Sequence, residues 1–171
     1  MSSSPLQILA DDPLAFLLLA AALIGAIALH EYAHALAADL QGDRMPRAMG
    51  RLTLNPARHL DPMGTVLIFL AGFGWGKPVE FRLQALSSKR FGAAIVALAG
   101  PLMNVLLATA AVILLRVFFA DYFFHGFLVR PAGTLLHFLI LFLRINLLLG
   151  IFNLLPIPPL DGSRLLTIFL P

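Results

Sequence analysis

Cysteine is absent from the 171-residue sequence, and charged residues make up only 12% of it. Without cysteine there are no disulfide bonds and no thiolate metal ligands, and the chain carries no sign of its redox compartment. A soluble domain has about twice this fraction of charged residues. Because 60% of the residues are hydrophobic, the composition indicates a membrane protein.

The few ionisable residues are unevenly spread along the chain. Stretches that contain none, or at most two, occur at residues 13–29, 62–76, 91–115 and 131–160. A bilayer span needs about 20 mostly apolar residues. We therefore predict an all-α multi-pass membrane protein that crosses the bilayer at about residues 14–38, 92–116 and 133–157.

Most of the basic residues lie in one connection. Eight of the twelve Lys and Arg residues fall within residues 39–91, and the N-terminal tail has none. Basic residues beside apolar spans set membrane orientation, so the net charge of +3 does not indicate a nucleic-acid partner. We expect residues 39–91 to be cytoplasmic and the N-terminus to lie outside the cell membrane.

This orientation requires that residues 62–76 do not cross the membrane. As a helix, these residues would rise about 22 Å, against a hydrocarbon core of about 30 Å. Four glycines also make the segment a poor uninterrupted helix. We predict a re-entrant segment here; a short span through a thin membrane is the alternative.

Two parts of the cytoplasmic connection alternate between apolar and polar residues. The pattern lies within residues 48–54 and 78–83, and it predicts a small β element of two short strands. Irregular loops are the alternative for segments this short.

A polar cluster stands at the end of the first apolar stretch, with the sequence HEYAH. His30 and His34 are four residues apart, so they share one face of a helix and can bind one ion. Glu31 is placed to take a proton from water bound to that ion. Ionisable side chains on a membrane helix cost several kcal/mol and are rare unless they are functional. The alternative is a helix end that faces lipid headgroups.

A catalytic zinc ion takes three protein ligands and an open position. No further histidine follows at the spacing of the soluble zinc proteases. The predicted topology and helix geometry leave three acidic candidates: Asp61, Glu80 and Asp161. Asp161 stands out because three prolines break the last apolar helix just before it. Non-helical backbone at membrane depth is tolerated where it lines a wet cavity, although an ordinary Asp-Gly turn is the alternative here.

Three motifs cover nearly the whole chain: HEYAH at 30–34, AGPLMN at 99–104 and NLLPIPPLDG at 153–162. In kind and order they resemble the motifs of the site-2 protease family of intramembrane zinc metalloproteases. The resemblance implies one membrane-embedded metalloprotease domain over residues 1–171, in a compact form without a PDZ or CBS domain. It also implies a three-helix core.

The resemblance implies roles for individual residues. His30, His34 and Asp161 are the expected ligands of one zinc ion per chain, and Glu31 is the expected catalytic carboxylate. The implied substrates are transmembrane helices of other proteins.

Other polar residues in the apolar stretches have more than one interpretation. Asn153 and Asn104 are candidates for binding substrate or stabilising an oxyanion, with interhelical hydrogen bonding as the alternative. His59 is a candidate for a contact behind the metal ligands, although a hydrogen-bonded loop histidine is favoured. Arg144 lies in the middle of the third span, where we expect it to have a partner inside the protein. Asn146 shares a helix face with Asn153 and is expected to pack.

These observations predict a zinc endopeptidase that hydrolyses peptide bonds within or near transmembrane helices. A metal transporter would use the same histidines but would need further polar residues along a path to the outer side. An inactive membrane adaptor would have no need of Glu31. The substrate and the oligomeric state are not determined by the sequence.

Overall fold

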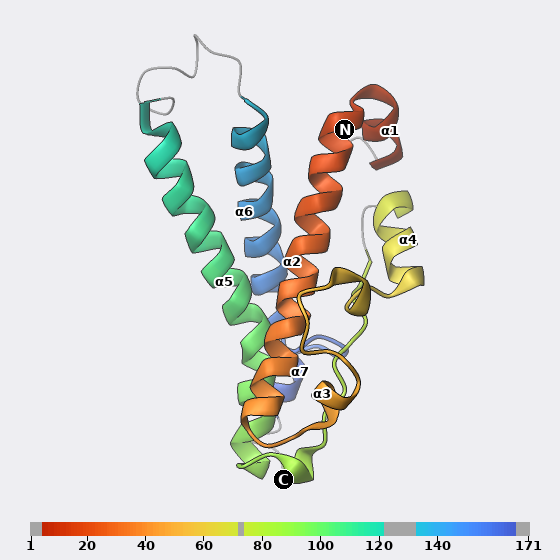
Figure 1. Ribbon diagram of the computed structural model, residues 1–171, viewed down its shortest axis with the longest axis vertical. Helices are drawn as coiled ribbons and strands as arrows, with labels where there is room; N and C mark the ends of the chain where they lie inside the picture. The colour runs from red at the N-terminus through yellow and green to blue at the C-terminus, as the bar shows by residue number, and fades with distance from the viewer. Residues whose placement is uncertain (1–4, 72–73, 122–132, 167–171) are drawn as a thin grey trace.

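The computed structural model describes residues 5–71, 74–121 and 133–166. Three long helices dominate it: α2 (Pro13–Leu40), α5 (Lys89–Asp121) and α6 (Thr134–Asn153) (Figure 1). Each contains a stretch long and apolar enough to cross a membrane. The prediction of a mainly helical protein with three candidate spans is therefore confirmed.

The remaining described elements are short. They are α1 (Pro5–Asp11), α3 (Met45–Ala48), η1 (Pro56–Arg58), α4 (Pro62–Ala71), η2 (Leu83–Ala85) and α7 (Gly162–Leu165). The helix α1 precedes α2, the elements α3, η1, α4 and η2 lie in the connection between α2 and α5, and α7 follows the loop after α6 (Figure 1).

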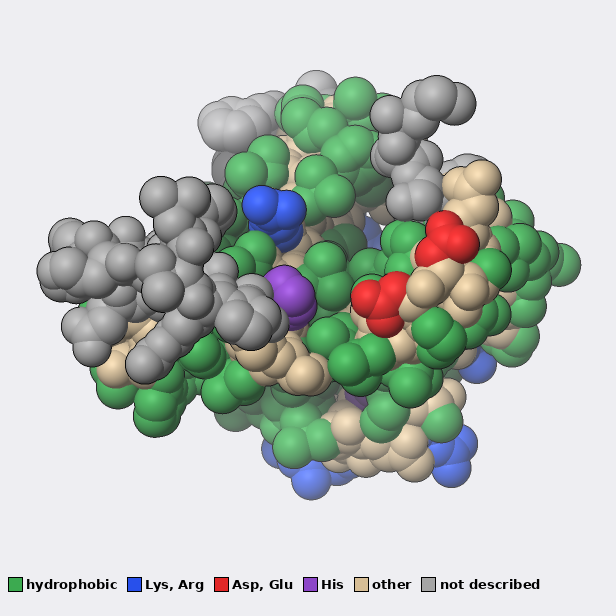
Figure 2. Space-filling model, turned by 90° about the horizontal axis from the view of Figure 1, so that it is seen from above, with side chains coloured by type: hydrophobic (Ala, Val, Ile, Leu, Met, Phe, Trp, Pro, Cys, Tyr) green, Lys and Arg blue, Asp and Glu red, His purple; other side chains and the backbone are tan. Residues whose placement is uncertain are grey.

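Small side chains allow the three long helices to pack closely. Ala22 and Ala26 of α2 are fully buried against Ile145 of α6. Close approach of backbones through small residues is the usual way in which membrane helices associate. Large hydrophobic side chains are exposed along the long helices, for example Leu102, Leu106 and Ile113 of α5. Hydrophobic side chains also predominate among the described residues at the end of the molecule where α1 lies (Figure 2). Such a surface suits contact with lipid.

Arg144 is a charged residue on this otherwise apolar surface. Its side chain is exposed on α6, and no hydrogen bond or ion pair joins it to another of the described residues. The expected internal partner is thus not found in this part of the chain, because the face of α6 that carries Arg144 points away from the helix bundle.

Buried charged side chains hold the connection between α2 and α5 together. Asp43 is fully buried and accepts hydrogen bonds from the backbone N–H groups of Met45 (3.0 Å) and Arg82 (2.5 Å). The guanidinium of Arg51, also buried, donates to the carbonyls of Arg58 (2.5 Å) and Pro78 (2.9 Å). These contacts fasten residues 78–82 to the end of α2 and to the loop after it.

The predicted strands at residues 48–54 and 78–83 are wrong. Neither segment is a strand, and the pairing of Leu60 with Gly76 is an isolated bridge in the described part of the chain. Side chains, rather than a partner strand, bond backbone groups of the second segment at Pro78 and Arg82. In the first segment Gly50 has a φ of +69°, which turns the chain out of an extended path.

The helix α4 occupies the first ten residues of the segment predicted to be re-entrant. Ten residues rise about 15 Å as a helix, about half the thickness of the hydrocarbon core. The chain returns to its starting point, since Leu60 pairs with Gly76. Between these ends, α4 lies beside the N-terminal half of α2, where the rings of Phe16 and Phe69 are 5.3 Å apart (Figure 1).

Candidate metal centre

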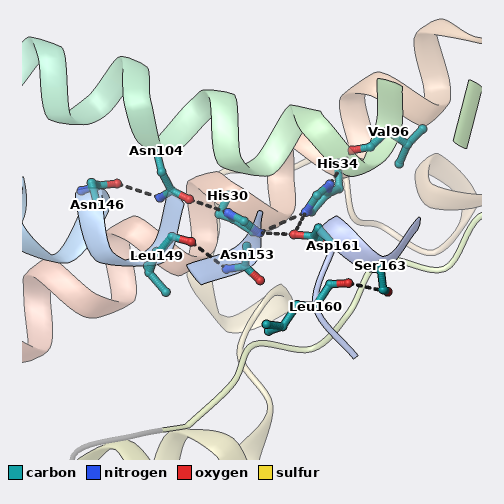
Figure 3. Close-up of polar contacts among 10 residues, drawn as sticks. All are labelled: His30, His34, Val96, Asn104, Asn146, Leu149, Asn153, Leu160, Asp161 and Ser163. Atoms are coloured by element: carbon teal, nitrogen blue, oxygen red, sulfur yellow. Dashed lines mark hydrogen bonds and ion pairs between the residues drawn. The ribbon is translucent and has the colours of Figure 1, made fainter. Parts of the chain in front are cut away.

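Three potential metal ligands from distant parts of the sequence meet beside α2 (Figure 3). Nε2 of His30 lies 3.0 Å from Nε2 of His34, and Oδ2 of Asp161 lies 3.1 Å from each of them. Among the described residues, this is the group of His, Asp and Glu side chains arranged to hold a metal ion. The other two acidic candidates, Asp61 and Glu80, are not part of it.

Regular helix and irregular loop both contribute to this geometry. One turn of α2 separates His30 from His34 and sets their rings edge to face, with centroids 4.6 Å apart. Asp161 comes from the proline-containing loop after α6. That loop is compact, because a Cβ placed on Gly162 would overlap the carbonyl oxygens of Leu154 and Leu155. The close approach returns the chain toward the end of α6 and brings Asp161 to the histidines.

The Nε2 atom of His34 is available as a ligand. Its Nδ1 atom lies 2.7 Å from the carbonyl oxygen of Val96, which can only accept, so Nδ1 carries the proton and donates. In a neutral ring, Nε2 then holds a lone pair. This lone pair faces the Nε2 of His30 and the carboxylate of Asp161, so all three groups offer electron pairs to the same point.

The spacing of the three atoms suits zinc. Zn–N and Zn–O bonds of about 2.0–2.1 Å in a tetrahedral site place the ligand atoms about 3.3 Å apart. The observed separations of 3.0–3.1 Å are close to this value. Two neutral nitrogens and one carboxylate also belong to the ligand set typical of catalytic zinc. The residues present therefore fit a zinc ion.

The carboxyl group of Asp161 is suited to remain ionised. Its partial burial raises its pKa, but contacts with the His30 and His34 imidazoles, when these carry protons on Nε2, lower the pKa more, to below its usual range. A bound cation would take the place of those protons. An ionised carboxylate is the form that binds a metal ion.

Gly100 brings the backbone of α5 directly against the two imidazoles. A Cβ on this residue would lie 2.6 Å from Nε2 of His30 and would also overlap Nε2 of His34. Real Cβ atoms do not approach other atoms so closely. The second residue of the AGPLMN motif is therefore a glycine because there is no space for a side chain beside the two imidazoles.

A pocket of about 530 Å³ opens beside the three ligands. Glu31 lines it together with the ligands, and its Oε2 atom is buried without a hydrogen-bond partner among the described residues. Gly76 lies against this carboxylate, since a Cβ there would be 3.3 Å from Oε1 of Glu31. A carboxylate held next to a metal site, with a free oxygen, can accept a proton from a molecule in the pocket.

The remaining predicted residues take different positions. Asn153 lines the pocket, and its Nδ2 donates to the carbonyl of Leu149 (3.0 Å). Asn104 is fully buried behind His30, with its Oδ1 2.5 Å from Nδ1 of that ring, and it does not line the pocket. His59 lies in the connection rather than at the metal centre; its Nε2 donates to the carbonyl of Thr53 (2.8 Å).

Several residues that shape the site have roles that the sequence did not predict. Asp43 and Arg51 hold the wall of the pocket at residues 78–82, and a buried charge is not visible in a loop sequence. Asn146, expected only to pack, donates its side-chain amide to the carbonyl of Phe142 and accepts from Asn104. The occurrence of two asparagines within apolar spans was the available signal.

Comparison with known families places the chain in the metallopeptidases. The model of peptidase family M50 matches residues 18–130 and 128–171. The match covers most of the chain, so the protein belongs to peptidase family M50, and the resemblance to the site-2 proteases is confirmed. With three helices able to cross a membrane, it is an integral membrane protein.

Curated relatives carry names that mark them as candidate zinc metalloproteases. The chain is 40% identical over 151 residues to YwhC of Bacillus subtilis, covering 87% of this chain and 67% of that protein. It is 33% identical over 154 residues to Rip2 of Mycolicibacterium smegmatis, covering 86% of this chain and 55% of that protein. The chain thus spans about half to two thirds of the length of these relatives. No solved structure matches it.

Proposed function

We propose that this protein is a zinc metalloendopeptidase of the membrane that cleaves other membrane proteins within or near their transmembrane helices. The observation that carries the proposal is the convergence of His30, His34 and Asp161 beside a buried Glu31 oxygen that has no hydrogen-bond partner in the described parts of the chain. Membership of peptidase family M50 and the names of the relatives support it. Residues 1–171 then form one metalloprotease domain embedded in the bilayer.

In this proposal, His30, His34 and Asp161 hold one zinc ion. The bound ion supplies Lewis acidity, which polarises the scissile carbonyl and makes water nucleophilic near neutral pH. The Glu31 carboxylate accepts a proton from the attacking water and then donates it to the nitrogen of the departing amine. The side-chain amide of Asn153, which lines the same pocket, is available to bind the substrate backbone.

A transmembrane substrate must unwind before it reacts, because its carbonyls are bonded within its own helix. Residues 74–81 line the pocket with a non-helical backbone. An unwound substrate pairs with such a segment through main-chain hydrogen bonds. In this arrangement the wall held by Asp43 and Arg51 receives the substrate.

The proposed topology places the metal centre toward the cytoplasm and the N-terminus outside. The concentration of basic residues within 39–91 supports it. The return of the chain from Leu60 to Gly76, with the apolar helix α4 between them, supports re-entry of residues 62–76. A cysteine introduced at Ser87 should then be protected from an impermeant reagent added outside intact cells. Labelling from outside would contradict both the orientation and the re-entrant segment.

Metal analysis combined with substrate cleavage tests the function. The purified full chain should contain one zinc ion and cleave a model transmembrane substrate. Glu31→Gln keeps the size of the side chain but cannot accept the proton, so it should retain zinc and cleave at least about a hundredfold more slowly. Near-normal cleavage by this variant would remove Glu31 from the mechanism. A zinc-loaded wild type that cleaves none of several helix-destabilised substrates would favour a transporter or an adaptor.

A further inference from the structure

A chain of buried amides joins His30 to the third long helix (Figure 3). Nδ1 of His30 lies 2.5 Å from Oδ1 of Asn104, and Nδ2 of Asn104 lies 2.8 Å from Oδ1 of Asn146. Nδ2 of Asn146 lies 2.8 Å from the carbonyl oxygen of Phe142, one turn earlier on α6. Both asparagines are fully buried and neither lines the pocket, so they do not meet the substrate.

The direction of the hydrogen bonds between these side chains is set at the Phe142 carbonyl. The carbonyl of Phe142 can only accept, so Asn146 must direct its NH2 group there and its oxygen toward Asn104. Asn104 then donates its own NH2 group to Asn146 and turns its oxygen toward His30. Because an amide oxygen can only accept, Nδ1 of His30 carries the proton.

The tautomer of His30 follows from this direction. A neutral imidazole with its proton on Nδ1 has its lone pair on Nε2, the atom that faces Asp161. His34 reaches the same state more directly, because its Nδ1 donates to the backbone carbonyl of Val96. The two histidines thus have the same tautomer, set by a helix carbonyl in each case, but only His30 depends on intervening side chains.

We propose that Asn104 and Asn146 are a pair of positioning residues that fix the tautomer and ring orientation of His30 for metal binding; this inference rests on the proposed zinc site. Asn104 supplies the acceptor for Nδ1. Asn146 keeps the Asn104 amide from turning over, since a reversed amide would offer an NH2 group to Nδ1 and move the proton to Nε2. The metal site is thereby tied to all three long helices.

Zinc affinity of the full chain in detergent, measured by competition with a chromophoric chelator, tests the pair. Asn104→Leu removes the acceptor at similar volume and should weaken binding about 10–100-fold, the usual range for partners of metal-bound histidines. Asn104→Asp keeps an acceptor for Nδ1, and its buried carboxyl, in the protonated form, can still donate to Oδ1 of Asn146, so this variant should restore most of the affinity. Asn146→Leu should weaken binding about tenfold, because the Asn104 amide can then reverse. Thr109→Val is the control, since Thr109 is exposed and its hydroxyl donates within α5, to the Val105 carbonyl (2.8 Å).

Nitrogen NMR of the imidazoles separates positioning from a merely structural role. In the zinc-free wild type, the signals assigned to His30 by their loss in His30→Gln should show a proton on Nδ1. The same form should persist in Asn104→Asp and become mixed with the Nε2-protonated form in Asn104→Leu and Asn146→Leu. Loss of packing alone would not shift the proton between the two nitrogens.

Several results would overturn the inference. Wild-type zinc affinity in Asn104→Leu would do so, as would equal losses in Asn104→Leu and Asn104→Asp, which would point to packing rather than to the acceptor. A wild-type His30 protonated on Nε2 would contradict the direction of the hydrogen bonds. Failure of the wild type to bind zinc would instead defeat the proposed function, while the NMR measurement would still decide the tautomer.

Discussion

The helix bundle and the connection between α2 and α5 use buried polar side chains in different ways. In the bundle, Asn104 and Asn146 are neutral, and they link one helix to the next with a defined direction. In the connection, Asp43 and Arg51 are charged, and they bind backbone groups that have no partner strand. Neutral amides are less costly to bury at membrane depth than charges. The first arrangement bonds to the ring of His30, one of the proposed metal ligands, and the second holds the wall of the pocket.

If this division is right, changes in the bundle should affect metal binding, whereas changes in the connection should affect substrate cleavage with the metal still bound. The largest effect is expected from replacing the proposed metal ligands. His34→Ala or Asp161→Ala leaves two protein ligands and should abolish both stoichiometric zinc and cleavage. His137→Ala, an exposed histidine on α6, is the control and should retain both. Full zinc content in Asp161→Ala, measured by metal analysis, would require another residue as third ligand.

A single methyl group at the contact between α5 and the ligands should give the next largest effect. Gly100→Ala places a Cβ 2.6 Å from Nε2 of His30, so α2 and α5 must move apart. Overpacking of this kind costs about 1–3 kcal/mol. We expect a lower thermal stability and weaker zinc binding, measured by unfolding in detergent and chelator competition. Gly25→Ala is the matched control, because its Cβ would make an ordinary contact of 3.8 Å with Phe142.

A change in the connection between α2 and α5 should slow substrate cleavage but leave zinc binding unchanged. Burial would raise the pKa of Asp43, but its hydrogen bonds with Arg82 and Met45 lower the pKa, so the carboxylate stays ionised. Asp43→Asn loses the charge and should cost about 1.5–3 kcal/mol, the usual value for hydrogen bonds to a charged group. Proteolysis of residues 41–88 should become faster and substrate cleavage slower, at unchanged zinc content. Asp12→Asn, which caps α2 at an exposed position, should change none of these. Loss of zinc from Asp43→Asn would mean that the two regions are not separable.

The smallest expected effect concerns pH. Burial lowers the pKa of His59 and the charge of Arg51 lowers it further, although its hydrogen bond with the Thr53 carbonyl raises it. The unfolded connection therefore binds a proton more readily than the folded one, so its stability is present above the unfolded pKa of about 6.5 and is lost as pH falls below that value.

Hydrogen exchange can measure this effect at the Lys77 amide, which donates to the His59 carbonyl (2.7 Å). Its protection factor, corrected for the intrinsic rate, should fall between about pH 7 and pH 5. His59→Gln keeps an N–H donor but does not titrate, so its protection should vary less over this range. Equal pH dependence in the two proteins would assign the titration to another group.

Local patterns in the sequence were sufficient for the spans and for the paired histidines. Uncharged stretches of sufficient length predict membrane helices, because the cost of burying charge in lipid applies residue by residue. The four-residue spacing of His30 and His34 places them together through helix geometry alone. Topology and helix geometry narrowed the candidates for a third ligand to three acidic residues, and the motif around Asp161 favoured this residue among them. The prediction of two strands was wrong because a short alternating segment does not reveal whether side chains will hydrogen-bond to the backbone groups that a partner strand would otherwise bind.

The sequence by itself determined which residue types stand at helical spacing and which stretches can enter a bilayer, since both depend on neighbours in the chain. Only the tertiary structure decided which residues from other parts of the chain contact these helices. It set Gly100 against the imidazoles, brought Asp161 back from beyond α6, and aligned Asn104 and Asn146 behind His30. These contacts join residues 42 to 131 positions apart, and the direction of the hydrogen bonds through Asn104 and Asn146 depends on a carbonyl of the third helix. No local pattern carries that information, because it arises only when the helices pack.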